Sequence, residues 1–346
     1  MAFRDQEPCG FCWWLFLLCV SLIFVCNSSI SSNSVATVEA RPSSLFSVLD
    51  YGASARKLSS LVNTSLVIPY HDGPLLSGKT LSVYVIWYGS FTPVQQAIVR
   101  DLLASFQGSS VNQQPSVNGW WTTTANYKDA SNTVVGTVQM QGEIEIGIGS
   151  LGTSLQRTDL ETLVLQSLET FPIDAEAIYL VLTAEDVLVQ DFCMSSCAFH
   201  FFTTAQPATN SLELPYAWVG NSAIQCPGQC AWPYALPQYG PQGAQALIPP
   251  NGDVGMDGMC INIGTMLAGT ATDPFNNGYY QGNPAAPLEA ATACTGIFGA
   301  GAYPGYAGQL LQDRITGASF NAYGVNNREF LLPAIWDPST LQCTPP

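Results

Sequence analysis

Two histidines and one late glutamate are the residues of this sequence best suited to metal or acid–base chemistry. His71 lies in YHDGP and His200 in CAFHFF, and the chain has no other histidine. Imidazole nitrogens and carboxylate oxygens are common zinc ligands, so His71, His200 and Glu289 form a candidate metal set. Histidines beside turn residues or aromatic rings more often hydrogen-bond a loop carbonyl or pack in a core. We therefore expect structural roles for both histidines and keep a metal-dependent hydrolase as the alternative.

Other patterns that often mark catalytic or binding sites are weak here. Asp253 and Asp257 in GDVGMDG could bind calcium, but the remaining acids of an EF-hand are absent, which favours a turn leading into a helix N-cap. No G-x-S-x-G sequence marks a serine nucleophile. The glycine run Gly296 to Gly308 lacks the Lys-Ser/Thr of a phosphate-binding loop, so it is expected to be a flexible loop.

Aromatic residues in expected loops are a second candidate site. Planar rings can stack on the apolar face of a sugar, and they can equally pack inward to complete a small core. We favour packing and keep binding of a polysaccharide as an alternative function. The candidate stacking residues are Trp121, Trp232, Tyr234 and Tyr279.

The cysteines indicate an oxidising compartment. The chain has 11 cysteines, of which Cys9, Cys12, Cys19 and Cys26 lie in or before an apolar segment near the N-terminus. The others are Cys193, Cys197, Cys226, Cys230, Cys260, Cys294 and Cys343. This odd number permits three disulfides and one free thiol, whereas two C-x3-C pairs leave zinc as a weaker alternative. Cys260, at the start of an apolar helix, is expected to be the buried free thiol, and the connectivity of the rest stays open.

The N-terminal segment is expected to direct secretion. Phe11 to Cys26 is uncharged and mostly apolar, too short for a typical membrane span but suited to a signal peptide, with cleavage near Ala40 favoured over an uncleaved anchor. Residues 1–40 are therefore a signal peptide and lead-in, residues 41–65 a flexible segment, and residues 66–346 the folded domain. In a secreted chain the NTS sequence at Asn63 is a glycosylation site.

The composition excludes one class of partner. The formal charge is −15 and only 10% of residues are charged. Such a surface repels nucleic-acid phosphates and anionic membranes, so neither is expected as a partner after cleavage of the signal.

Strand and helix patterns alternate along the first half of the domain. Strands are expected over Thr80 to Gly89, within NTVVGTVQMQGEIEIG, and over Ala177 to Thr183, with helices over Val94 to Phe106 and Thr158 to Thr170. This order predicts a mixed α/β (α+β) fold: a single domain with a central sheet flanked by helices. Beyond Cys193 the sequence is rich in Pro, Gly, aromatics and cysteines, which predicts an irregular, disulfide-stapled second half that contains one apolar helix, Met259 to Ala271.

Several long blocks resemble a known family. YHDGPLL (70–76), LPYAWVGNSAIQCPGQCAWPYALP (214–237), PNGDVGMDGM (250–259) and GQLLQDRITGASFNAYG are similar to the phosphate-induced, EXORDIUM-like family of secreted land-plant proteins. The resemblance runs from about Tyr70 to Cys343. It implies a protein of the apoplast or cell wall that is involved in growth and in brassinosteroid or carbon-status responses.

The late helix departs from the pattern that the resemblance implies. Family members carry His-Glu-x-x-Glu there, a zincin-like arrangement that could hold a metal on one helix face. The corresponding residues of this chain are Thr265, Met266 and Gly269, and of a downstream acidic pair only Glu289 remains, with Thr292 at the second position. We therefore expect a non-catalytic protein without a cofactor, whose partner is an unidentified wall polysaccharide or apoplastic protein.

Overall fold

The computed structural model describes residues 66–108, 113–149, 151–238, 245–284 and 286–346. The expected signal peptide, its cleavage near Ala40, the flexible segment 41–65 and the sequon at Asn63 lie outside these residues. Within the described ranges, no helix has the length and apolar character needed to cross a membrane.

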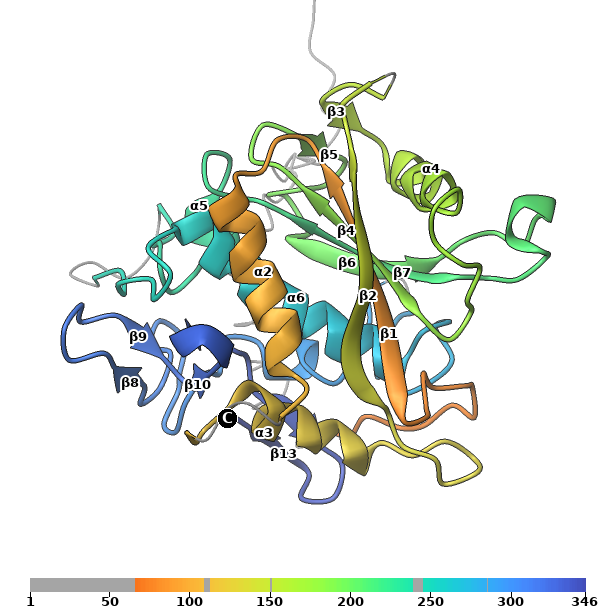
Figure 1. Ribbon diagram of the computed structural model, residues 1–346. Coiled ribbons are helices and arrows are strands. Elements are labelled where there is room, and N and C mark those ends of the chain that lie inside the picture. Colours follow the sequence, from red (N-terminus) through yellow and green to blue (C-terminus); the bar gives the residue numbers. More distant parts are fainter. Residues whose placement is uncertain (1–65, 109–112, 150, 239–244, 285) are drawn as a thin grey trace, which may run out of the picture. The chain divides into compact units, whose positions relative to one another are not determined.

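A five-stranded sheet forms the centre of the domain (Figure 1). Its strand order is β2-β1-β4-β7-β6, with the first four strands parallel and β6 antiparallel to β7. The middle strands are almost completely buried and are rich in β-branched, aromatic and leucine side chains, as expected where both faces of a parallel sheet are covered. The strands are β1 (Thr80–Tyr88), β2 (Thr137–Ile146), β4 (Ile178–Thr183), β6 (Ala198–Phe202) and β7 (Pro215–Gly220).

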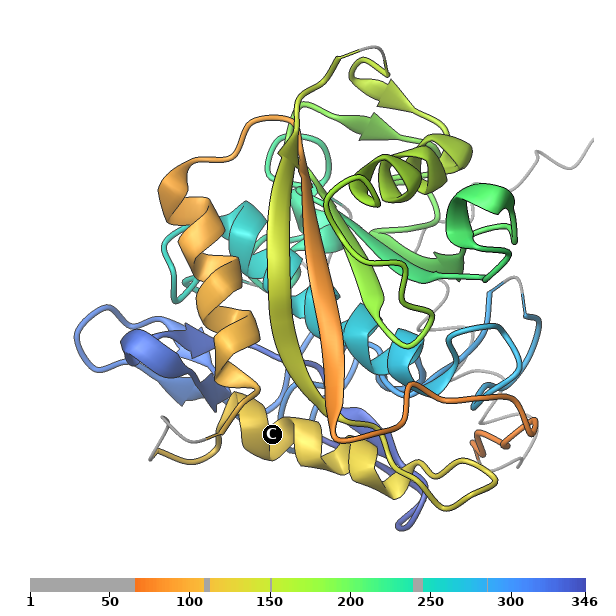
Figure 2. The ribbon, with the colours of Figure 1, turned by 45° about the vertical axis from the view of Figure 1, so that its right-hand side comes forward.

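Helices cover both faces of this sheet. On one face lie α2 (Pro93–Ser105) and α6 (Val254–Thr272), and on the other lies α4 (Arg157–Ser167), as Figures 1 and 2 show. Helix α2 begins at the capping box of Thr92 and Gln95, with Pro93 in its first turn. The expected α/β fold with a central sheet flanked by helices is confirmed.

Shorter elements surround this framework. Beside the sheet lie α3 (Val117–Trp121), η1 (Thr122–Asn126), β3 (Ser154–Leu155), β5 (Leu188–Val189), η2 (Pro207–Thr209) and α5 (Pro227–Cys230). Short ribbons and turns complete the C-terminal part: η3 (Thr292–Cys294), β8 (Leu311–Gln312), β9 (Ser319–Phe320), β10 (Ala322–Tyr323), η4 (Val325–Asn327), β11 (Glu329–Phe330), β12 (Ile335–Asp337) and β13 (Gln342–Thr344).

The second half contributes more to the sheet than its composition predicts. Strands β6 and β7 follow Cys193, yet they complete the central sheet rather than forming irregular structure. Helix α6 is longer than the expected Met259 to Ala271, because the Asp253 side chain accepts the Met256 amide and starts the helix earlier. The helix is buried along nearly its whole length, which explains why its sequence lacks a polar face.

Candidate functional site

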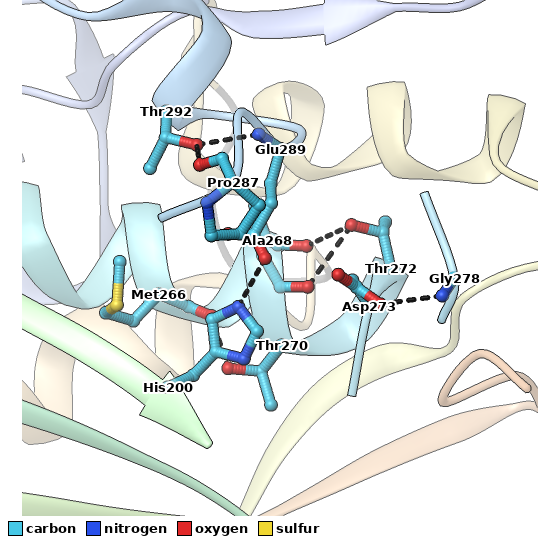
Figure 3. Close-up of polar contacts among 11 residues, drawn as sticks. His200, Met266, Ala268, Thr270, Thr272, Asp273, Gly278, Pro287, Glu289 and Thr292 are labelled. Atoms are coloured by element: carbon cyan, nitrogen blue, oxygen red, sulfur yellow. Dashed lines mark hydrogen bonds and ion pairs between the residues drawn. The ribbon is translucent and has the colours of Figure 1, made fainter. Parts of the chain in front are cut away.

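His200 and Glu289 meet beside α6 although 89 positions separate them in sequence. His200 projects from β6, and Glu289 lies just before η3, where the Thr292 hydroxyl accepts the Glu289 amide (Figure 3). The His200 Nε2 and Glu289 Oε1 atoms are 2.7 Å apart, and the side chains are 5% and 3% exposed. This contact is therefore a buried, charge-assisted hydrogen bond.

A second carboxylate lies close to this pair. Asp273, at the C-terminal end of α6, is fully buried and accepts the Gly278 amide at 2.6 Å through Oδ1. Burial raises the pKa of Asp273 above its usual value, with a further contribution from Glu289, against the Gly278 hydrogen bond. We call His200, Asp273 and Glu289 the buried polar cluster.

The charges of the buried polar cluster favour protonated His200. Burial by itself lowers the pKa of His200, but the charge of Glu289, its hydrogen bond and the charge of Asp273 together bring the pKa above its usual value. Among the described residues, His200 Nδ1 and Asp273 Oδ2 have no hydrogen-bond partner.

The three positions of α6 that correspond to the metal motif add no ligand to the cluster. Gly269 lies directly against it: a Cβ at this position would be 2.8 Å from Glu289 Oε2 and 3.3 Å from His200 Nε2. The Thr265 hydroxyl donates to the Ile261 carbonyl one turn earlier, and the Met266 side chain is buried in the core. A glycine is therefore required where the resemblance implies the last acid of the metal motif.

His71 does not join His200 and Glu289. It is exposed and lies next to the β-bridge between Tyr70 and Tyr279. Its ring stacks on Tyr280 with the ring centroids 4.0 Å apart, and its Nε2 lies 3.0 Å from the Tyr280 carbonyl oxygen. In the part of the chain that the structure describes, no group of three or more His, Cys, Asp or Glu residues is arranged to bind a metal. The described structure therefore does not bring His71 together with His200 and Glu289. The three-residue metal set stays an alternative hypothesis to the structural roles expected for both histidines.

The Asp253 and Asp257 pair belongs to the helix start. Asp253 is the N-cap of α6, and the carboxylate of Asp257 accepts the backbone amide and the side-chain amide of Asn251 at 3.0 and 2.6 Å. Burial raises the pKa of Asp257 to about 7 despite these hydrogen bonds. This arrangement agrees with a turn leading into a helix and not with calcium ligation.

The aromatic candidates are used for packing. Trp121 is 4% exposed and donates its indole N–H to the Gly136 carbonyl, and Tyr234 is 3% exposed and donates to the Ser319 carbonyl. Trp232 is half-buried beside Phe298, and Tyr279 is half-buried between Tyr70 and Tyr127. Trp121 and Tyr234 are therefore buried in this structure, with almost no ring surface in contact with solvent.

Six cysteines pair as three disulfides. Cys193–Cys226 and Cys197–Cys230 join the strand β6 region to α5, and Cys294–Cys343 joins η3 to the C-terminal strand β13. Cys260 is a free thiol on α6 and is 1% exposed. Burial raises its pKa well above the usual value, so the thiol stays protonated.

Asp273 is the member of the cluster that no sequence pattern marks as a site residue. Its Asp-Pro sequence was visible as a helix end, because proline does not continue a helix. Nothing local indicated that its carboxylate would turn toward residues on β6 and before η3.

Comparison with known proteins identifies relatives across almost the whole described region. Residues 68–346 match the family described as phosphate-induced protein 1 conserved region. Protein EXORDIUM of Arabidopsis thaliana is 48% identical over 307 residues, which cover 86% of this chain and 95% of the relative. Protein EXORDIUM-like 2 of the same plant is 46% identical over 303 residues (86% and 96%), and Protein PHOSPHATE-INDUCED 1 of Nicotiana tabacum 46% over 296 residues (84% and 92%). No solved structure matches the chain significantly.

Proposed function

Because the chain belongs to the EXORDIUM and phosphate-induced protein 1 family, we propose that it is a secreted, non-catalytic protein of the apoplast or cell wall that regulates growth. Its molecular action is binding, either to a wall polysaccharide or to another apoplastic protein. Brassinosteroid and carbon-status responses are the growth pathways that the family resemblance implies.

The observation that carries the non-catalytic part of this proposal is the composition of the buried polar cluster. A histidine hydrogen-bonded to a carboxylate is an arrangement that general bases use, but the His200 and Glu289 side chains are almost completely buried. Gly269 supplies no donor, and its backbone lies too close to the pair to leave space for another group. A catalytic dyad needs contact with a substrate within hydrogen-bond reach. The cluster therefore serves to join β6, α6 and the segment before η3.

The disulfides support the proposed location. Three bridges fasten the region from Cys193 to Cys343, and disulfides of this kind form and persist in oxidising compartments. The location is tested by expressing the full chain with a C-terminal fluorescent tag in plant cells and plasmolysing them. We expect fluorescence in the wall and the space outside the shrunken protoplast. Fluorescence confined to the protoplast contradicts the proposal.

Metal content separates this function from the hydrolase alternative. We expect less than stoichiometric zinc in protein purified from the secreted fraction and dialysed. About one zinc per chain, lost in His200→Ala and kept in His71→Ala, would establish a metal site at the cluster and overturn the non-catalytic assignment.

A further inference from the structure

Two tyrosines flank the two-residue turn of a β-hairpin within Gly296 to Gly308, the glycine run that was expected to be a flexible loop. Tyr303 and Tyr306 pair across Pro304 and Gly305, with amide-to-carbonyl distances of 3.1 and 2.8 Å in the two directions. Gly305 has φ 91°, which suits the third position of a turn that begins Tyr-Pro-Gly. The next paired residues, Ala300 and Gln309, extend the ribbon, so the segment has a defined backbone.

The tyrosine rings face solvent while the rest of the hairpin is anchored. Tyr303 is 59% exposed and Tyr306 40%, and their ring centroids lie 5.2 Å apart with 38° between the ring planes. Ala307 and Phe298 are 5% and 4% exposed and belong to a hydrophobic cluster with Tyr234 and Leu331. The buried residues of the hairpin thus hold two adjacent rings toward solvent. Because the backbone is already ordered, binding a partner costs less conformational entropy.

The electrostatic surroundings favour an uncharged ligand. From Ala290 to Gln312 the chain has no charged residue, and the whole chain carries a formal charge of −15. A polyanion such as a uronate polymer is repelled by such a protein, and a cationic ligand finds no carboxylate in the hairpin. Sugar rings have apolar C–H faces bordered by hydroxyl groups. A tyrosine can contact both, through its ring face and its phenolic hydroxyl.

We propose that Tyr303 and Tyr306 form a stacking surface for a neutral cell-wall polysaccharide. This inference rests on the proposed extracellular function and names the ligand class for its binding activity. It replaces the four aromatic residues selected from the sequence, of which Trp121 and Tyr234 are buried and Trp232 and Tyr279 are packed against neighbouring rings.

A protein partner would use a wider surface. Protein interfaces of ordinary stability bury about 800 Å² on each partner and depend on clustered apolar anchors. The next two exposed aliphatic residues in the chain are Leu311 on β8 and Ile315 in the turn before β9, which are 38% and 94% exposed. Ile315 therefore offers a matched control, because its removal weakens a protein interface and leaves a tyrosine stacking surface intact.

The test uses purified full-length secreted protein and four probes: insoluble cellulose, soluble xyloglucan, glucomannan and, as the anionic control, polygalacturonate. We expect wild-type protein to bind at least one neutral polymer and not polygalacturonate, measured by pull-down and affinity electrophoresis. The Tyr303→Ala/Tyr306→Ala double variant should lose at least about tenfold in affinity, since each ring contributes a stacking contact. Tyr303→Phe/Tyr306→Phe should keep most of the binding, and Ile315→Ala should keep all of it.

Three results overturn the inference: no binding of wild-type protein to any neutral probe, binding unchanged in the double alanine variant, or equal loss in Ile315→Ala. Thermal unfolding of each variant confirms that lost binding is not lost folding, and the phenylalanine variant provides a second check. Loss of polysaccharide binding with wall localisation intact contradicts only this inference, whereas retention inside the protoplast contradicts the proposed function.

Discussion

At the scale of single residues, Gly269 shows most clearly how one position constrains the buried polar cluster. In an ordinary helix interior, alanine is about 1 kcal/mol more favourable than glycine. Here the added methyl would approach Glu289 Oε2 to 2.8 Å and disturb its contact with His200. We expect Gly269→Ala to lower the free energy of unfolding by about 1–2 kcal/mol, measured by urea denaturation.

The matched control for this prediction removes Glu289 Oε2, the atom closest to a Cβ at position 269. In a Glu289→Ala background the shortest contact is gone and only His200 remains near a Cβ at position 269, with Nε2 at 3.3 Å, so Gly269→Ala should be clearly less harmful there, up to neutral. If Gly269→Ala is equally harmful in both backgrounds, close approach to Glu289 is not the reason for the glycine.

Cys260 allows the burial of α6 to be measured with a chemical probe. The thiol is 1% exposed and burial raises its pKa, so both access and thiolate formation are suppressed. The test uses protein from the secreted fraction whose signal peptide, with Cys9, Cys12, Cys19 and Cys26, has been cleaved. We expect it to resist iodoacetamide in the native state and to take up one label when denatured without reduction, located at Cys260 by mass spectrometry. Cys260→Ala should take up none. Rapid labelling of the native protein would show that α6 is accessible.

At the scale of elements, the N-terminal turn of α6 makes stability depend on pH. Burial raises the pKa of Asp257 to about 7 from an ordinary value of 3.8, so the native state holds a proton that the unfolded chain releases between these values. This contribution is fully present below about pH 4 and is lost as the pH rises through 7, with an upper limit of roughly 4 kcal/mol. The raised pKa of His200 acts in the same direction, because its contribution is lost as the pH rises above its folded value.

We therefore expect the urea midpoint to fall between pH 5 and pH 8. Asp257→Asn should flatten this slope whatever its effect on stability at one pH, because the amide does not titrate. Asp186→Asn, at an exposed position, should leave the slope unchanged. A midpoint that is constant or rises over this range in the wild type would contradict the assignment of Asp257.

The elements also show which parts of the fold the sequence can predict. Helix α2 was predictable because Thr92, Pro93 and Gln95 are local start signals followed by apolar residues at helical spacing. Strand β7 is hard to predict because it begins with Pro215, which ordinarily argues against a central strand. The His200–Glu289 contact depends on three elements brought together only by the sheet order, so no local pattern reveals it.

At the scale of the whole domain, the C-terminal segment completes the core far from its own position in sequence. Strand β12 supplies Trp336, which packs with Ile68 and Cys294, and the Trp336 carbonyl accepts the Tyr127 hydroxyl at 2.5 Å. Asn126 donates to Asp337 in the same region. The segment therefore bridges the first described residues, η1 and η3, and the Cys294–Cys343 disulfide fastens it there.

Removing this disulfide should loosen the C-terminal segment specifically. The bridge spans 49 residues, for which the chain-entropy relation gives roughly 4 kcal/mol of stabilisation. We expect Cys294→Ser/Cys343→Ser to lower the unfolding free energy by about 2–4 kcal/mol and to expose the β12–β13 hairpin to limited proteolysis before the sheet is cut. The matched control removes Cys193–Cys226 and Cys197–Cys230 together, because these two bridges join the same segments and either one alone keeps the 33-residue loop closed. Loss of both bridges should leave the C-terminal hairpin protected. The same early cleavage in both variants would mean that the hairpin depends on global stability alone, and not on its own covalent link to η3.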